Sequence, residues 1–196
     1  MRVILASASP RRIELMRRLF KDFDVMPACG EEKSEETAPD KYVIALASAK
    51  AFEIEEKVKD SEDEYIIIGA DTVVSKDGNI LGKPKDSVDA ERMIHMLEGD
   101  KHQVYTGVSL IVNDSMGRRN IGFAEKTDVK FNKMTREEII DYINYRDENG
   151  SPEWEDKAGA YAIQGYCSKY IAGIFGDFYN VVGFPIAEIY RRLNFK

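Results

Sequence analysis

Cysteine, histidine and tryptophan are scarce in this chain, which has two Cys, two His and one Trp among its 196 residues. Cys29 and Cys167 lie far apart and lack the paired spacing of metal ligands, so we expect a reducing environment and no cysteine chemistry. His95 and His102 are not spaced as a metal-binding pair either. The sequence therefore argues against a disulfide-stapled protein and against a metal site built from Cys and His.

Long hydrophobic runs and an excess of positive charge are also missing. The longest apolar stretch, Tyr65 to Ala70, is far too short to span a bilayer, and the first residues lack a signal-peptide pattern. The formal net charge of -7 argues against wholesale binding to nucleic acid or to an anionic membrane surface. We therefore expect a soluble, cytoplasmic protein that holds any anionic ligand with local basic residues.

What the chain does contain is an alternation of strand and helix patterns. Helical spacing of apolar residues predicts helices over Pro10–Phe20 and Pro39–Lys59, from Asp86 or Ser87 to Leu97, from Thr135 onward, and after Pro185. Branched or alternating apolar residues predict strands over Val3–Ala6, Phe23–Met26, Tyr65–Ala70, Gln103–Val112, Ile121–Phe131, Tyr161–Ile163 and Tyr170–Phe175. After Asp71 and Thr72, we expect Val73 and Val74 to continue extended into a turn at Lys76–Asn79, with Ile80–Leu81 as the returning hairpin arm. The pattern predicts an α/β fold with a mixed, twisted sheet flanked by helices, in one domain over residues 1–196.

The first strand leads into a segment suited to phosphate, Ser7-Ala8-Ser9-Pro10-Arg11-Arg12. Ser9 suits the N-cap and Pro10 the first position of the following helix, whose free amides and dipole favour an anion. Arg11 and Arg12 add guanidinium groups that pair with phosphate oxygens in a bidentate way. We interpret this segment as a phosphate site, with a plain helix cap and solvated arginines as the alternative.

Asp71 is the leading catalytic candidate. We expect it at the exit of a buried strand, an edge of a sheet where ligands usually bind. Its carboxylate could bind a metal or activate water, or it could simply cap a turn toward Thr72.

A second basic candidate, Lys83, lies in a segment that superficially resembles a nucleotide-binding P-loop. The segment Gly78–Pro84 has one residue too few between its glycines, and a proline stands where the P-loop requires Ser or Thr. A P-loop is therefore excluded.

A loop rich in small residues, Asp156–Gly165, follows later in the chain. Its charged pair, aromatic side chain and amide favour a loop that closes on a flat polar ligand, and Gln164 could read the edge of a base. The alternative is a tight structural loop. Trp154, just before it, could stack on a base or pack against the protein.

Together these segments resemble the Maf family of nucleoside triphosphate pyrophosphatases over nearly the whole chain. The motifs that carry the resemblance are Leu5–Arg12, Tyr42–Ala51, Gly69–Val74, Gly82–Pro84, Tyr105–Val108, Asp156–Gly165 and Asn180–Pro185. The resemblance implies two α/β lobes around a central substrate cleft. It also implies hydrolysis of a nucleoside triphosphate between its α and β phosphates, giving a monophosphate and pyrophosphate.

The resemblance also implies roles for individual residues. Asp71 matches the proton acceptor, and Glu32 and Asp71 match the metal side of the site, with Glu31 competing with Glu32 for that position. The positions that match substrate contacts are Ser7, Arg11, Arg12, Lys50, Thr72, Lys83, Lys157 and Gln164. Arg11, Thr72 and Gln164 resemble the branch that acts on dTTP and UTP, whereas the 7-methyl-GTP branch typically has Trp, Gln and Glu there.

The expected cofactor is a divalent cation, Mg²⁺ or Mn²⁺, because oxygen ligands and a triphosphate suit these ions. The resemblance also implies a homodimer, and modified pyrimidine nucleotides are further candidate substrates. Two other functions stay open. One is a 7-methyl-GTP or broad-range nucleotide pyrophosphatase, and the other is a nucleotide-binding regulator of cell division without significant turnover.

Overall fold

The computed structural model describes residues 1–60 and 64–193. The chain divides into two compact units. The first comprises Met1–Asp71, Thr106–Glu125 and Gly183–Lys196, and the second comprises Thr72–Tyr105 and Lys126–Val182. Three strands contribute residues to both units, so each unit is built from segments that are distant in sequence.

The strands form one seven-stranded sheet in the order β2-β1-β3-β5-β6-β7, with β4 paired to β3. Their bounds are β1 (Arg2–Leu5), β2 (Asp24–Val25), β3 (Tyr65–Lys76), β4 (Asn79–Leu81), β5 (Lys101–Asp114), β6 (Gly117–Phe131) and β7 (Ile171–Phe175). The helices are α1 (Pro10–Met16), α2 (Pro39–Val58), α3 (Ser87–Leu97), α4 (Arg136–Asn144), α5 (Phe178–Val182) and α6 (Ile186–Leu193). Parallel pairing of β1 with β2 and β3, and antiparallel pairing of β6 with β7, make the sheet mixed. The predicted mixed α/β class is confirmed.

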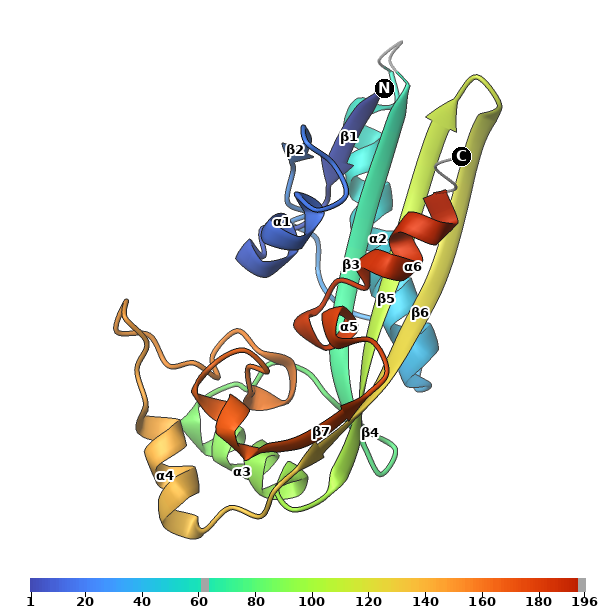
Figure 1. Cartoon of the computed structure of the whole chain (residues 1–196). Coiled ribbons are helices and arrows are strands. Elements are labelled where there is room, and N and C mark those ends of the chain that lie inside the picture. Colours follow the sequence, from blue (N-terminus) through green and yellow to red (C-terminus); the bar gives the residue numbers. More distant parts are fainter. Residues whose placement is uncertain (61–63, 194–196) are drawn as a thin grey trace. The chain divides into compact units, whose positions relative to one another are not determined.

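In the first unit, the helix α2 packs against strands β3 and β5 at very short range. A β-carbon added to Gly107 would lie 2.3 Å from the carbonyl oxygen of Val43, so the absence of a side chain permits this approach. Ile4, Ile54 and Ile67 are fully buried in the core between the helix and the strands. Figure 1 shows α2 and α6 on opposite faces of these strands.

The core of the second unit gathers α3, α4 and the neighbouring strands around large apolar side chains. Leu97, Phe131 and Tyr142 are almost fully buried there. The capping box predicted at the start of α4 is confirmed, because the Thr135 hydroxyl accepts a bond from the Glu138 amide and the Glu138 side chain accepts one from the Thr135 amide.

Four local predictions are corrected. Helix α1 ends at Met16 rather than Phe20. Ser9 and Pro10 occupy the predicted N-cap and first helical positions, but the Ser9 side chain makes no capping hydrogen bond, and the Ser9 amide donates to the Ser7 hydroxyl at 3.3 Å. The predicted strand end at Ala70 is wrong, because β3 continues through Asp71 to Lys76. The predicted extension over Val73 and Val74 and the hairpin arm at Ile80–Leu81 are confirmed by the antiparallel pairing of β3 with β4. Residues 161–163 form no strand, since this segment is held by side chains rather than by a β-ladder.

Both cysteines are free thiols, with Cys29 exposed and Cys167 buried. Within the described ranges, none of the helices is long and apolar enough to cross a membrane.

Candidate active site

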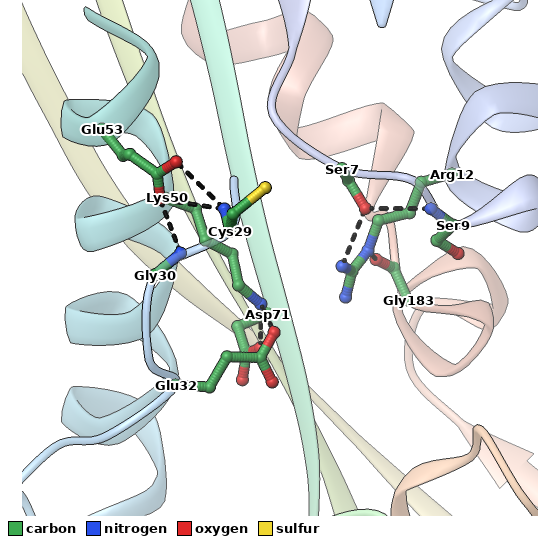
Figure 2. Close-up of polar contacts among 10 residues, drawn as sticks. All are labelled: Ser7, Ser9, Arg12, Cys29, Gly30, Glu32, Lys50, Glu53, Asp71 and Gly183. Atoms are coloured by element: carbon green, nitrogen blue, oxygen red, sulfur yellow. Dashed lines mark hydrogen bonds and ion pairs between the residues drawn. The ribbon is translucent and has the colours of Figure 1, made fainter. Parts of the chain in front are cut away.

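An ion-pair cluster on the first unit joins three of the predicted site residues (Figure 2). The ammonium nitrogen of Lys50 lies 2.6 Å from Asp71 Oδ1 and 2.8 Å from Glu32 Oε1. The side chains of Lys50 and Asp71 are 14% and 11% exposed, whereas that of Glu32 is 50% exposed. One cation therefore holds two carboxylates, one of them buried and the other facing solvent.

Asp71 reaches Lys50 because of the contact between β3 and α2. A β-carbon on Gly69 would lie 2.2 Å from the carbonyl oxygen of Ala47, so the helix lies over the face of the strand that Gly69 leaves bare. Side chains two positions apart on a strand share a face, and residues three apart on a helix are neighbours. Asp71 follows Gly69 by two positions on the strand, and Lys50 follows Ala47 by three on the helix. The Asp71 and Lys50 side chains therefore meet next to the Gly69–Ala47 contact.

The structure also distinguishes Glu31 from Glu32, the two glutamates of the acidic loop that matched the same position of the family. Glu32 pairs with Lys50, while Glu31 pairs with Lys33 at 2.8 Å and both of those side chains are 78% exposed. Glu32 is therefore the glutamate that lies beside Asp71.

Arg12 forms a second polar group in the same unit. Its Nε donates to the carbonyl oxygen of Gly183 at 2.9 Å, and its Nη1 donates to the Ser7 hydroxyl at 3.4 Å. Gly183 has a φ of 109°, a conformation that favours glycine and that turns its carbonyl to the guanidinium. The motif Asn180–Pro185 thus fixes an arginine of the N-terminal motif, although the two are far apart in sequence.

The charges of the two groups affect each other. Burial and the neighbouring Arg11 guanidinium lower the pKa of Arg12, whereas the carboxylates of Asp71 and Glu32 act in the opposite direction. Tyr42 on α2 belongs to the same environment, since burial and then the charges of Asp71 and Glu32 raise its pKa. A partly desolvated guanidinium beside carboxylates is a suitable partner for a polyanion that arrives with its own counter-cation.

Arg11 is half-buried on α1 in the first unit, and the remaining predicted site residues lie in the second unit. Thr72 is half-buried on β3, Lys83 and Gln164 are exposed, and Lys157 is paired with Asp156. The motif that contains Lys83 and the loop that contains Lys157 and Gln164 are joined directly, because the amide of Gly159 donates to the carbonyl of Gly82 at 3.0 Å.

Two aromatic side chains of this unit are structural. Trp154 is 7% exposed, and its indole nitrogen donates to the Ile143 carbonyl at 3.0 Å, so it packs in the core and does not offer a face to a base. The Tyr161 hydroxyl lies 2.9 Å from Nε2 of the fully buried His102. These contacts favour a tightly anchored Asp156–Gly165 loop.

The first unit contains oxygen donors for a divalent cation in Glu32 and Asp71. Their shared contact with the Lys50 ammonium shows that the carboxylates lie where positive charge is stabilised. No group of three or more Asp, Glu, His or Cys side chains in the described residues could hold a metal alone. Mg²⁺ is usually held by one or two carboxylates together with substrate phosphates and water. The donor set fits such an ion.

The family model described as Maf-like protein matches residues 2–195 of this chain, which covers both compact units and every motif described above. The chain belongs to the Maf family. Proteins named dTTP/UTP pyrophosphatase are similar to it at 46% identity in Agathobacter rectalis (97% of this chain, 95% of the relative) and at 43% in Clostridium acetobutylicum (98% and 96%). Among solved structures, the Staphylococcus aureus Ham1 protein is similar at 15% identity with a TM-score of 0.46, over 98% of each chain.

Three residues around the site of this Maf-family chain were not predicted as site residues from the sequence. Tyr42 and Gly183 stand inside motifs that carried the resemblance, but nothing in their spacing gave them a contact with the site. Glu53 on α2 accepts bonds from the loop amides of Cys29 and Gly30. The helical spacing of Lys50 and Glu53 was the available signal, since it places both side chains on one face of the helix.

Proposed function

We propose that this protein is a nucleoside triphosphate pyrophosphatase that converts dTTP and UTP to the monophosphate and pyrophosphate. The observation that carries the proposal is the buried Asp71 carboxylate, held at 2.6 Å by Lys50, beside Glu32 and within electrostatic reach of Arg12. The substrate comes from the names of the relatives, which support a pyrimidine triphosphate. Cytoplasmic nucleotide pools are the proposed source of that substrate.

In the proposed reaction, the oxygen of a water molecule attacks the α phosphorus. The bond from that phosphorus to the bridging oxygen breaks, pyrophosphate leaves, and the proton of the water passes to a carboxylate oxygen of Asp71. Lys50 fixes the orientation of Asp71 through their ion pair, so the accepting oxygen is already in place.

The phosphates need several cationic partners. We assign Arg12 and Ser7 to phosphate oxygens, because the guanidinium is already oriented by the Gly183 carbonyl and the Ser7 hydroxyl. Glu32 and Asp71 would hold Mg²⁺ or Mn²⁺, and this ion would neutralise phosphate charge when bound. Lys83 and Lys157 are proposed as further phosphate contacts, and Arg11, Thr72 and Gln164 as residues that select the base.

Product analysis tests the proposal. The purified protein and its Asp71→Asn variant are incubated with dTTP, UTP, CTP, GTP or 7-methyl-GTP in Mg²⁺ or Mn²⁺, and products are separated by anion-exchange chromatography. Asp77→Asn is the matched control, because Asp77 is an exposed turn residue with a φ of 51°, a conformation that asparagine also adopts.

We expect monophosphate and pyrophosphate from dTTP and UTP with the wild type and Asp77→Asn, and at least about 10³-fold slower release with Asp71→Asn. Turnover of 7-methyl-GTP and of no other nucleotide would show that the assigned substrate is wrong, while the assigned reaction type would stand. Nucleotide binding without turnover in either metal would favour a regulatory protein instead.

A further inference from the structure

The carboxylate of Glu53 binds the main chain of the acidic loop that carries Glu32 (Figure 2). The Cys29 amide lies 3.0 Å from each of the two carboxylate oxygens, and the Gly30 amide donates to Oε2 at 2.9 Å. Lys57 donates to Oε1 at 2.8 Å from the next turn of α2. The loop is thus held against α2 by Glu53, which is not one of the predicted site residues.

These contacts lie next to the Lys50 cluster on the same helix. Lys50 and Glu53 are three positions apart on α2, so their side chains leave one face of the helix. Gly30 and Glu32 are two positions apart in the loop. The helix therefore holds the loop at two successive points, with Glu53 on the Gly30 amide and Lys50 on the Glu32 carboxylate.

The loop relies on such external contacts because residues 26–37 form no regular helix or strand. Its approach to the helix is close, since a β-carbon on Gly30 would lie 3.1 Å from Glu53 Oε2. Hydrogen bonds from Lys57 and from the Cys29 and Gly30 amides lower the pKa of Glu53 to about 2. The carboxylate is therefore ionised across the neutral range, where its bonds to amides are charge-assisted.

We propose that Glu53 is a positioning residue that fixes the loop Cys29–Glu32 on α2 and thereby presents the Glu32 carboxylate to the divalent cation and phosphates at Asp71. This inference rests on the proposed function and adds a residue to it. Glu53 itself is directed at loop amides, so its effect passes through Glu32.

The test is a double-mutant cycle between Glu53→Ala and Glu32→Gln, with Glu56→Gln as the matched control on the same helix. Glu56 is exposed and pairs with Lys59 at 2.6 Å, away from the loop amides. Three quantities are measured for each variant: hydrogen exchange of the Cys29 and Gly30 amides by NMR, Mn²⁺ affinity by electron paramagnetic resonance, and kcat/KM for dTTP.

Glu53→Ala is expected to speed exchange of both amides and to weaken Mn²⁺ binding and kcat/KM by about fivefold, the equivalent of roughly 1 kcal/mol. In the Glu32→Gln background, Glu53→Ala should change Mn²⁺ affinity and kcat/KM by less than about twofold, because the positioned carboxylate is already gone. Glu53→Gln keeps one acceptor oxygen and should lie between the wild type and Glu53→Ala. Glu56→Gln should match the wild type in all three measurements.

An additive cycle, or unchanged amide exchange in Glu53→Ala, would overturn the positioning role while leaving the proposed function intact. If no triphosphate were hydrolysed but the double-mutant cycle in Mn²⁺ affinity still showed coupling between Glu53 and Glu32, the proposed function would be wrong and the positioning role would stand. A wild-type protein without either turnover or Mn²⁺ binding would overturn both.

Discussion

The main chain of Gly69 lies against Ala47 so closely that a β-carbon on Gly69 would stand 2.2 Å from the Ala47 carbonyl oxygen. The obstructing atom belongs to the helix backbone, which cannot rotate away as a side chain would. This contact brings α2 onto β3 and places Lys50 beside Asp71. The proposed catalytic cluster therefore depends on a glycine that makes no polar contact with it.

Gly69→Ala should lower the free energy of unfolding by at least about 2 kcal/mol, because the helix and the strand must separate to admit the methyl group. Gly82→Ala is the control, since a β-carbon there meets no atom within 4 Å, and its effect should stay within about 0.5 kcal/mol. Urea unfolding followed by circular dichroism measures both. Equal stability of the two variants would contradict the close contact.

Lys50→Met should bind Mn²⁺ more tightly than the wild type, by about tenfold, because two carboxylates lose their shared counter-cation and attract another. Turnover of dTTP should nevertheless slow, since Asp71 loses the partner that orients it. Metal titration and kcat are read on the same preparation. Weaker Mn²⁺ binding in this variant would show instead that Lys50 promotes metal binding.

Arg12→Lys should reduce kcat/KM for dTTP by about 10- to 100-fold, because an ammonium cannot make the parallel bonds of a guanidinium fork. The expected unfolding midpoint is close to that of the wild type. Arg18→Lys serves as the control, since Arg18 lies in the turn after α1 and pairs at 3.6 Å with the exposed Glu14. An equal fall of kcat/KM in both variants would remove Arg12 from bidentate phosphate binding, because the Arg18 guanidinium is assigned no phosphate contact.

The pH dependence of stability should contain a contribution from His102. Burial lowers its pKa to about 4, and the Lys76 charge acts in the same direction while Asp100 and Asp128 oppose it. The unfolded chain has a histidine pKa of about 6.5 and so binds the proton first. This contribution to stability is present above about pH 6.5 and is lost as the pH falls toward 4, by up to about 3 kcal/mol.

His102→Gln removes that titration and should flatten the fall in unfolding free energy between pH 7 and pH 4.5. Because other groups titrate over the same range, the difference between variant and wild type isolates the histidine. Parallel stability curves for the two proteins would show that His102 is not held neutral.

Gln164→Glu should reduce kcat/KM for dTTP and UTP by about 10-fold or more, because an amide that both donates and accepts is replaced by a carboxylate that only accepts. Gln164 is exposed, so the fold should be unaffected. Steady-state kinetics with dTTP, UTP and 7-methyl-GTP measure the change. A uniform loss on all three nucleotides would remove Gln164 from base selection.

Much of the fold followed from local patterns. The capping residues of α4, the apolar face of α2 and the branched apolar residues of β3 each act over a few neighbouring positions, so the sequence predicted those elements. The continuity of β3 through Asp71 was not predictable in this way. Asp71 interrupts the apolar pattern and therefore predicted a strand end, whereas the structure keeps it inside β3, where it pairs with Lys50 of another element.

The identity of the candidate site residues was also available from the sequence, because the motifs carry a family resemblance whose family the match over residues 2–195 confirms. Their contacts were not. The sequence could not choose between Glu31 and Glu32, since adjacent acidic residues in a loop have the same local chemistry. The choice is made by the position of Lys50 on α2, and the role of Trp154 is likewise set by the core around it.

The sequence by itself determined the types of element, the net negative charge and the set of chemical groups available to a triphosphate, because these depend on residue type and short-range spacing. Only the tertiary structure decided which groups meet. Lys50 joins Asp71 and Glu32, Gly183 orients Arg12, and Glu53 binds the loop amides. Each of these contacts links residues far apart in the chain, and their proximity arises from the packing of helices on strands rather than from any local pattern.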